Sequence, residues 1–247
     1  MKSIERHKLK ENEFARSVAQ ARETLEQRKR DITVMAAVVV GLLIAVAAFV
    51  WWRESRAAAA NGKLAHALAI YDAPVVPIPK PAPGSPPPVQ QPGTYPTDEA
   101  KFDASLPLFI ETANQYPSAQ AGITARYTAA SILARTGKLA EAEQQYQQVI
   151  DKAGSGIYSK TARLGLADVQ VAQGKYDNAI SIYTELSRDP NSLIPVDSVL
   201  MQLGRTYARA GRKEEAAGAY NRIISEFPQS IYGADARREL ETVKKPA

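Results

Sequence analysis

The chain has 247 residues, of which 45% are hydrophobic and none is cysteine. This composition supports a folded core and excludes disulfides, thiolate metal sites and cysteine nucleophiles. The formal net charge of +5 lies before residue 98, because residues 1–31 carry +3, residues 32–97 carry +2 and residues 98–247 carry no net charge. A nucleic-acid-binding domain usually has a basic excess, so we expect no nucleic-acid partner.

The amino-terminal part joins a charged segment to an apolar one. Residues 1–31 are rich in charged helix formers and contain no proline or glycine, which predicts a cytoplasmic helical segment. Residues 32–52 carry no charged side chain and are long enough to cross a bilayer as a helix. Trp51 and Trp52 end this run, where interfacial aromatic residues belong. A cleaved signal peptide is the alternative, but its apolar core is usually only about 7–15 residues long.

Basic residues beside the span predict its orientation. Five Lys or Arg residues precede it within about 20 positions, and three follow it. Cytoplasmic flanks of membrane helices carry the larger number of Lys and Arg residues. We therefore expect a single-pass protein of the bacterial inner (plasma) membrane. Its amino terminus would be cytoplasmic, and the rest of the chain after the span periplasmic or otherwise extracytoplasmic.

Two segments follow the span before the repeats begin. Residues 53–72 are alanine-rich, which predicts a juxtamembrane helix and leaves open whether it belongs to a first, incomplete repeat. Residues 73–97 contain ten prolines, which favours an extended linker. A docking site for a proline-binding partner is the alternative to a plain spacer.

The remaining residues, 98–247, repeat with a period of 37 residues. A glycine is followed five residues later by alanine and nine residues later by tyrosine, at Gly137, Gly174, Gly211, Ala142, Ala179, Ala216, Tyr146, Tyr183 and Tyr220. A fixed period of this length is typical of stacked repeats, each built as two helices joined by turns. Glycine ends one helix cheaply in the left-handed conformation. We expect the alanine and tyrosine to be buried between the two helices of each unit.

This pattern resembles the tetratricopeptide repeat. The family's small residue, late glycine, alanine, aromatic and proline match Gly204, Gly211, Ala216, Tyr220 and Pro228. The resemblance covers residues 98–243, although the period exceeds the usual 34 residues and three family positions are replaced, by Gly154, Gln170 and Asn191. It implies an all-α solenoid after a single transmembrane helix. A plain helical bundle with coincidental spacing is the alternative.

The resemblance also implies a binding site. In tetratricopeptide repeats the first helix of each pair lines the groove that binds a peptide. Carried over position by position, this predicts a candidate peptide groove formed by Tyr127, Ser131, Arg135, Asp168, Met201, Arg205 and Arg209. The alternative is that these are ordinary solvated or packing residues. Only two histidines exist, His7 and His66, on opposite sides of the predicted span, so we expect no histidine-based catalytic or metal site, no enzyme activity and no cofactor.

The layout as a whole resembles the YfgM-like ancillary subunits of the Sec translocon. This resemblance implies a chaperone-like adaptor whose partners are translocon components or newly translocated proteins. The alternative is a structural scaffold for envelope or outer-membrane assembly or for cell division, with one stable partner. The stretch 227–232 is similar to the inter-repeat turn of such assembly factors.

Overall fold

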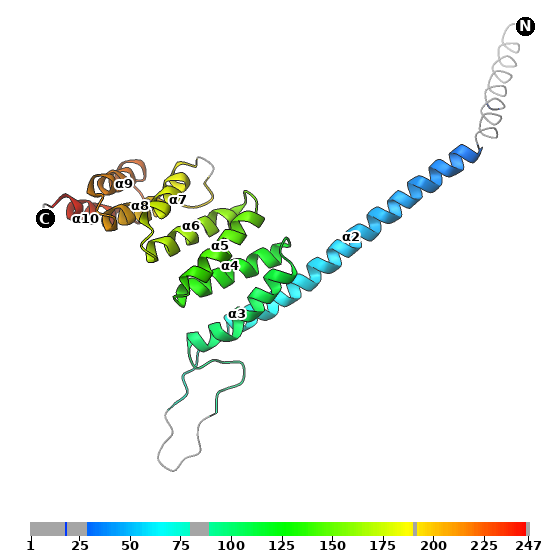
Figure 1. The fold of residues 1–247 in the computed structure, drawn as a ribbon, viewed down its shortest axis with the longest axis horizontal. Coiled ribbons are helices and arrows are strands. Elements are labelled where there is room, and N and C mark those ends of the chain that lie inside the picture. The colour runs from blue at the N-terminus through cyan, green and yellow to red at the C-terminus, as the bar shows by residue number, and fades with distance from the viewer. Residues whose placement is uncertain (1–17, 19–28, 80–88, 190–191, 246–247) are drawn as a thin grey trace, which may run out of the picture. The chain divides into compact units, whose positions relative to one another are not determined.

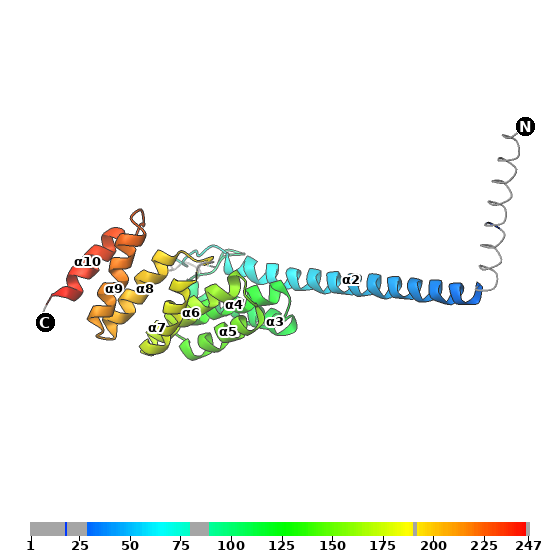
Figure 2. The same cartoon turned by 90° about the horizontal axis from the view of Figure 1, so that it is seen from above.

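The computed structural model describes residue 18 and residues 29–79, 89–189 and 192–245. Figures 1 and 2 show that the regular structure in these residues is helical. The helices are α2 (Lys29–Tyr71), α3 (Asp98–Gln115), α4 (Gln120–Arg135), α5 (Leu139–Lys152), α6 (Ile157–Ala172), α7 (Tyr176–Arg188), α8 (Val196–Arg209), α9 (Lys213–Glu226) and α10 (Gly233–Lys244). The all-α fold predicted from the periodicity is confirmed.

Helix α2 contains the apolar run predicted to span a membrane. Its stretch Thr33–Tyr71 has a window of mean hydropathy 2.8, in which no residue is buried. By length and composition this helix is able to cross a membrane. The predicted helical segment over residues 1–31 lies outside the described residues, apart from Val18 and residues 29–31.

The chain divides into two compact units, residues 1–56 and residues 57–247. In the second unit each helix from α3 to α10 packs against the next in antiparallel fashion (Figures 1 and 2). We call α4, α6 and α8 the A helices, and α5, α7 and α9 the B helices. Each A helix and the B helix after it form one repeat.

Glycine ends every A helix as expected. Gly137, Gly174 and Gly211 have φ angles of 77°, 76° and 77°. In each case the amide after the glycine donates to a carbonyl five residues earlier, as in Lys138 N to Leu133 O at 2.8 Å. This Schellman-type pairing satisfies carbonyl groups that the helix end would otherwise leave unpaired.

The repeated tyrosine and alanine are the centre of the packing. Tyr183 is 1% exposed and Ala179 is fully buried. The equivalent positions in the neighbouring repeats are also buried: Tyr146, Tyr220, Ala142 and Ala216. A Cβ atom at Gly204 would lie 2.5 Å from Cε1 of Tyr220, so the glycine is needed where the ring meets helix α8. The predicted burial between the two helices is confirmed.

The repeat stack begins earlier than residue 98. Leu64, Ala67, Leu68 and Tyr71 of α2 join a hydrophobic cluster with α3 and α4. The Tyr71 ring lies 5.9 Å from the Phe102 ring, between ring centroids. Residues 57–71 therefore serve as the A helix of a first repeat, with α3 as its B helix. This answers the question that the sequence left open about residues 53–72.

The proline-rich segment is inserted inside this first repeat. Its described ends lie side by side, because Val76 N donates to Tyr95 O at 2.8 Å and Tyr95 N donates to Pro74 O at 3.1 Å. The described ends of the segment thus meet between two packed helices, and the predicted linker over residues 73–97 lies partly outside the described residues. The packing of α2 on α3 brings the two ends of the segment together.

A fragment of residues 57–247 is expected to be more stable than one of residues 98–247. The shorter fragment leaves Phe102 and Phe109 without the cover of α2, which costs about 2–5 kcal/mol for two largely buried aromatic side chains. Urea unfolding of both fragments, followed by circular dichroism, measures the difference. Equal stability would mean that α2 is not part of the first repeat.

Substitutions at the repeat core provide a second prediction. Ala179→Leu is expected to cost about 1–3 kcal/mol by overpacking. Tyr183→Ala is expected to cost about 3–5 kcal/mol through the cavity it leaves. The control Ala172→Leu changes an exposed alanine at the end of α6 and should stay within about 0.5 kcal/mol. Losses below that value for both core variants in urea titrations would show that the repeat register is wrong.

Candidate protein-binding surface

The candidate groove residues lie on the three A helices at equivalent repeat positions. Helix α4 carries Tyr127, Ser131 and Arg135, α6 carries Asp168, and α8 carries Met201, Arg205 and Arg209. Six of these seven side chains are at least partly accessible. We call these six the helix-A surface: Tyr127, Ser131, Arg135, Asp168, Arg205 and Arg209.

Met201 is the exception. It is 1% exposed and belongs to the hydrophobic cluster of α6 to α10. The equivalent residues Tyr127 and Leu164 are half-buried, so this repeat position lies at the edge of the core. A flexible methionine fills the space that remains there. The structure therefore does not offer Met201 to a partner.

One position of each A helix faces the tyrosine of its own B helix. The Tyr183 hydroxyl donates to Oδ1 of Asp168. In the repeat before it, Ser131 at the equivalent position opposes the rise in the pKa of Tyr146. Arg205 is the equivalent residue in the next repeat and acts electrostatically on Tyr220. The buried tyrosines thus place their hydroxyl groups beneath the helix-A surface.

The first of these repeats carries an aromatic cluster. The Tyr127 ring centroid lies 5.8 Å from that of Tyr146 and 6.1 Å from that of Tyr158, both in edge-to-face geometry. Burial raises the pKa of Tyr146 to about 12, so its hydroxyl stays protonated at neutral pH. Arg135 lies two turns further along α4, with its guanidinium carbon 4.7 Å from the centre of the Phe102 ring of α3. This end of the surface combines rings with one cation.

The second repeat is acidic at the same position. Asp168 is accessible to solvent, yet protein atoms lie around its carboxyl group. This burial raises the pKa of Asp168, while the hydrogen bond from Tyr183 opposes the shift. Burial and the charge of Asp168 also raise the pKa of Tyr183. In this hydrogen bond the Tyr183 hydroxyl donates and the Asp168 carboxyl group accepts. Asp168 therefore keeps further lone pairs for a partner.

The third repeat is basic. Arg205 lies 3.9 Å from carboxylate oxygens of both Asp235 and Glu239 on α10. Arg209 is exposed, and its positive charge opposes the burial that raises the pKa of Tyr183 and of Tyr220. The surface therefore changes along the stack from aromatic to acidic to basic.

Sequence reasoning missed the polar role of the tyrosines. Tyr146, Tyr183 and Tyr220 were expected only to pack, and Tyr158 was not singled out. These three tyrosines follow Ser131, Asp168 and Arg205 by about the same short offset in every repeat, and this offset was present in the sequence. A tyrosine opposite a polar residue at one repeat position was the signal that would have revealed these contacts.

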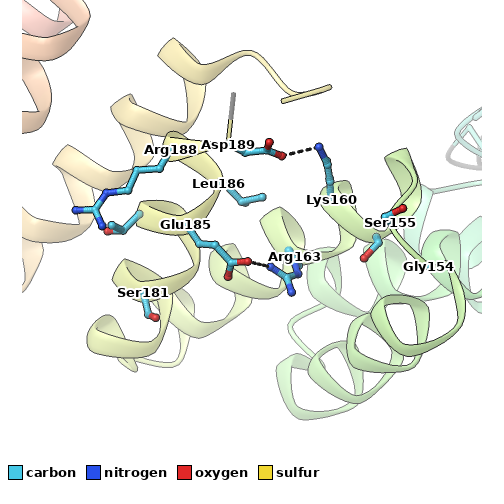
Figure 3. A pocket seen from close by; sticks show the side chains of 11 residues that line it. Gly154, Ser155, Lys160, Arg163, Ser181, Glu185, Leu186, Arg188 and Asp189 are labelled. Atoms are coloured by element: carbon cyan, nitrogen blue, oxygen red, sulfur yellow. Dashed lines mark hydrogen bonds and ion pairs between the residues drawn. The ribbon is translucent and has the colours of Figure 1, made fainter. Parts of the chain in front are cut away.

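A hollow lined by other residues than those of the helix-A surface lies between α6 and α7. Figure 3 shows this hollow, which has a volume of about 890 Å³. Two ion pairs cross it, from Arg163 to Glu185 and from Lys160 to Asp189. These pairs engage all of the charged side chains that line the hollow except Arg188. In the part of the chain that the structure describes, no group of three or more His, Cys, Asp or Glu side chains is placed to hold a metal ion.

The comparisons with known proteins agree with this geometry. The model of the tetratricopeptide repeat-like domain matches residues 26–242, which is most of the chain. This chain is a member of that family. The match includes the apolar run and the proline-rich loop as well as the repeats. No curated protein matches the chain significantly.

Solved structures show the same fold at low sequence identity. A Podosopora anserina kinesin-light-chain-like protein with nearly identical TPR-like repeats is 14% identical, with a TM-score of 0.50, over 59% of this chain and 78% of that one. BtubC (BKLC) from P. vanneervenii is 17% identical, with a TM-score of 0.50, over 59% of this chain and 66% of that one. The fold is that of a protein–protein interaction module and is typically not enzymatic.

Asp168→Asn provides a prediction for pH dependence. A carboxyl group whose pKa is raised by folding stabilises the fold below its unfolded pKa, and this stabilisation is lost as pH rises through the folded pKa. Asparagine keeps an oxygen acceptor for Tyr183 but has no charge. We expect the variant to be at least as stable as the natural chain at about pH 7, and the natural chain to gain on it towards about pH 4.

Urea unfolding of residues 57–247 at both pH values measures this difference. The comparison with the variant cancels the other acidic groups, such as Glu143, whose pKa is lowered by its hydrogen bond with Lys175. A variant that is less stable by the same margin at both pH values would contradict the raised pKa.

Proposed function

We propose that this protein is a membrane-anchored adaptor that binds protein partners through its helix-A surface. The observation that carries the proposal is the accessible row of rings, acid and bases on consecutive A helices. Arg and Tyr are the residue types most often found at the energetic centres of interfaces. Charges of both signs give such a surface the means to orient a peptide.

The apolar part of α2 supports the anchor. Val34, Leu42 and Phe49 expose 56%, 61% and 59% of their surface, which is unfavourable in water and favourable in lipid. The Arg56 guanidinium carbon lies 5.2 Å from the Trp52 ring centre, at the end of the run. Such a Trp and Arg pair suits the interface between lipid and water. We propose that the repeats lie outside the cytoplasm and that the partners are translocon components or newly translocated proteins.

The anchor is tested by a topology reporter. A reporter that is active only outside the cytoplasm, fused after residue 247, is expected to be active, because more basic residues precede the apolar run than follow it. The matched fusion uses a reporter active only in the cytoplasm and should be silent. Activity of the cytoplasmic reporter would overturn the proposed location and with it the role at the translocon.

The binding surface is tested by partner capture. Tyr127→Ala combined with Arg205→Ala is expected to weaken cross-linking to the partner at least tenfold, or about 1.4 kcal/mol. The control changes Gln147 and Gln148 to alanine on α5, where both side chains are exposed. Circular dichroism checks that both variants are folded. A normal yield from the first variant with a reduced yield from the second would place the partner on the B helices.

The pattern of cross-links also separates the adaptor from an envelope scaffold. An adaptor for transient clients gives many weak products enriched in secreted proteins. A scaffold gives one stoichiometric product. Mass spectrometry of products formed in native membranes distinguishes the two.

A further inference from the structure

The proline-rich segment begins with a run of exposed residues that carry only hydrocarbon side chains: Pro74, Val75, Val76, Pro77, Ile78 and Pro79. We call residues 74–79 the exposed run. Val75, Val76 and Ile78 expose 38%, 38% and 47% of their surface. Runs of more than about three exposed apolar residues are avoided in folded proteins unless they have a function. The exposed run is therefore a candidate binding surface, and it shares no residue with the helix-A surface.

Covalent geometry keeps the backbone of the exposed run extended. A proline ring fixes φ at about −65°, and the residue before a proline is restricted to extended conformations. These two rules apply to every residue from Ala73 to Pro79 except Val75. Val75 is extended as well, because it forms an isolated β-bridge with Tyr95. An extended chain with prolines at this density favours the polyproline II helix.

Hydrogen bonds tie the exposed run to the other described end of the segment. Val76 N donates to Tyr95 O at 2.8 Å, and Tyr95 N donates to Pro74 O at 3.1 Å. Nε2 of Gln90 donates to Val76 O at 3.2 Å. The run is therefore extended and held in place before any partner binds, which reduces the entropy lost on binding.

The backbone groups that the exposed run offers to a partner are mostly acceptors. Prolines have no N–H group, and the N–H group of Val76 already donates to Tyr95. Among the residues that the structure describes, none donates to the carbonyl groups of Val75, Pro77 or Ile78. A partner strand needs N–H groups as well as carbonyl groups along the edge that it joins, so the prolines disfavour pairing with a strand. A partner that supplies donors fits this run better.

We propose that residues 74–79 dock into a groove of a partner protein that is lined by tryptophan or tyrosine side chains. A polyproline II helix has about three residues per turn, so Pro74 and Pro77 form one ridge and Val75 and Ile78 form another. Grooves lined by aromatic rings accept such ridges. The N–H group of tryptophan and the O–H group of tyrosine also supply donors for the open carbonyl groups. This docking surface is separate from the helix-A surface and does not depend on it.

The test uses the full chain in native membranes, with a photo-activatable amino acid in place of Ile78. Mass spectrometry identifies the cross-linked molecule and the residue to which the label is attached. We expect a protein product in which the label is attached beside a tryptophan or tyrosine of the partner. The same amino acid in place of Val89 is the control, because this valine is 92% exposed in the same segment but lies outside the exposed run. It should not give this product.

A synthetic peptide provides a defined probe for the same contact. An excess of Ala-Pro-Val-Val-Pro-Ile-Pro, the sequence of residues 73–79, is expected to suppress the cross-link from position 78. The same peptide with alanine in place of its prolines should not, because it loses the preference for the polyproline II helix. The peptide contains no aromatic residue, so a change in the fluorescence of the purified partner on adding it reports contact with the partner's own rings.

Variants of the chain separate contact from tethering. Pro74→Ala combined with Pro77→Ala is expected to reduce the cross-link from position 78 about tenfold or more, and the repeats should stay folded because both prolines are exposed. Gln90→Ala removes a tether but no contact residue, so it should reduce the cross-link by a smaller factor. The matched control Gln91→Ala changes an exposed side chain and should have no effect. Circular dichroism checks that each variant is folded.

Several results would overturn this docking surface. These are cross-links only to lipid or to a second copy of this chain, labels attached away from any tryptophan or tyrosine, a product that survives the peptide or the double proline variant, and no product at all. The proposed function is judged separately. Tyr127→Ala combined with Arg205→Ala should leave the cross-link from position 78 unchanged, and its loss would show that the exposed run is not a separate surface.

Discussion

The close approach of helix A and helix B at the repeated tyrosine determines the rest of the structure. In each repeat the ring of Tyr146, Tyr183 or Tyr220 is buried, and alanine or glycine on the helices around it leaves the space it needs. Glycine at the end of helix A turns the chain back so that helix B can lie against it. Because the same contact recurs every 37 residues, the repeats stack one after another and their A helices form one row.

This contact also carries the chemistry of the surface. A tyrosine, unlike a phenylalanine, brings a hydroxyl group to the far side of the packed ring. Asp168 accepts a hydrogen bond from that group in one repeat, Ser131 occupies the equivalent position in the repeat before it, and Arg205 at the third position has no acceptor atom. The same packing rule thus produces three different surfaces, because only the A-helix residue changes. A repeat protein can alter its partner in this way without altering its core.

The sequence predicted the elements that the period fixes. Gly137, Gly174 and Gly211 marked the ends of the A helices, and the buried role of Ala179 and Tyr183 followed from their offsets. The period could not extend to residues 57–71, because the proline-rich insertion separates them from α3 by 26 residues instead of a short turn. Only the packing of Tyr71 and Ala67 on Phe102 and Phe109 reveals that they belong to the stack.

The sequence predicted which helices carry the candidate residues, but it did not predict how far each side chain is buried or what it contacts. Repeat offsets placed the helix-A residues correctly on α4, α6 and α8. They could not tell that Met201 is buried while Arg205, four residues on, is accessible, since this depends on how the neighbouring helices close over α8. The Tyr183–Asp168 hydrogen bond likewise depends on the distance between helices, and so does the Tyr220 hydroxyl, which has no partner among the residues that the structure describes.

The central claim is that a protein partner lies on the A helices. A photo-activatable cross-linking amino acid placed at Arg209 on α8, or at Gln148 on α5, tests it directly in native membranes. Both positions are exposed, so neither change disturbs the core. We predict protein cross-links from position 209 and few from position 148. Cross-links that form at position 148 and not at position 209 would contradict the account.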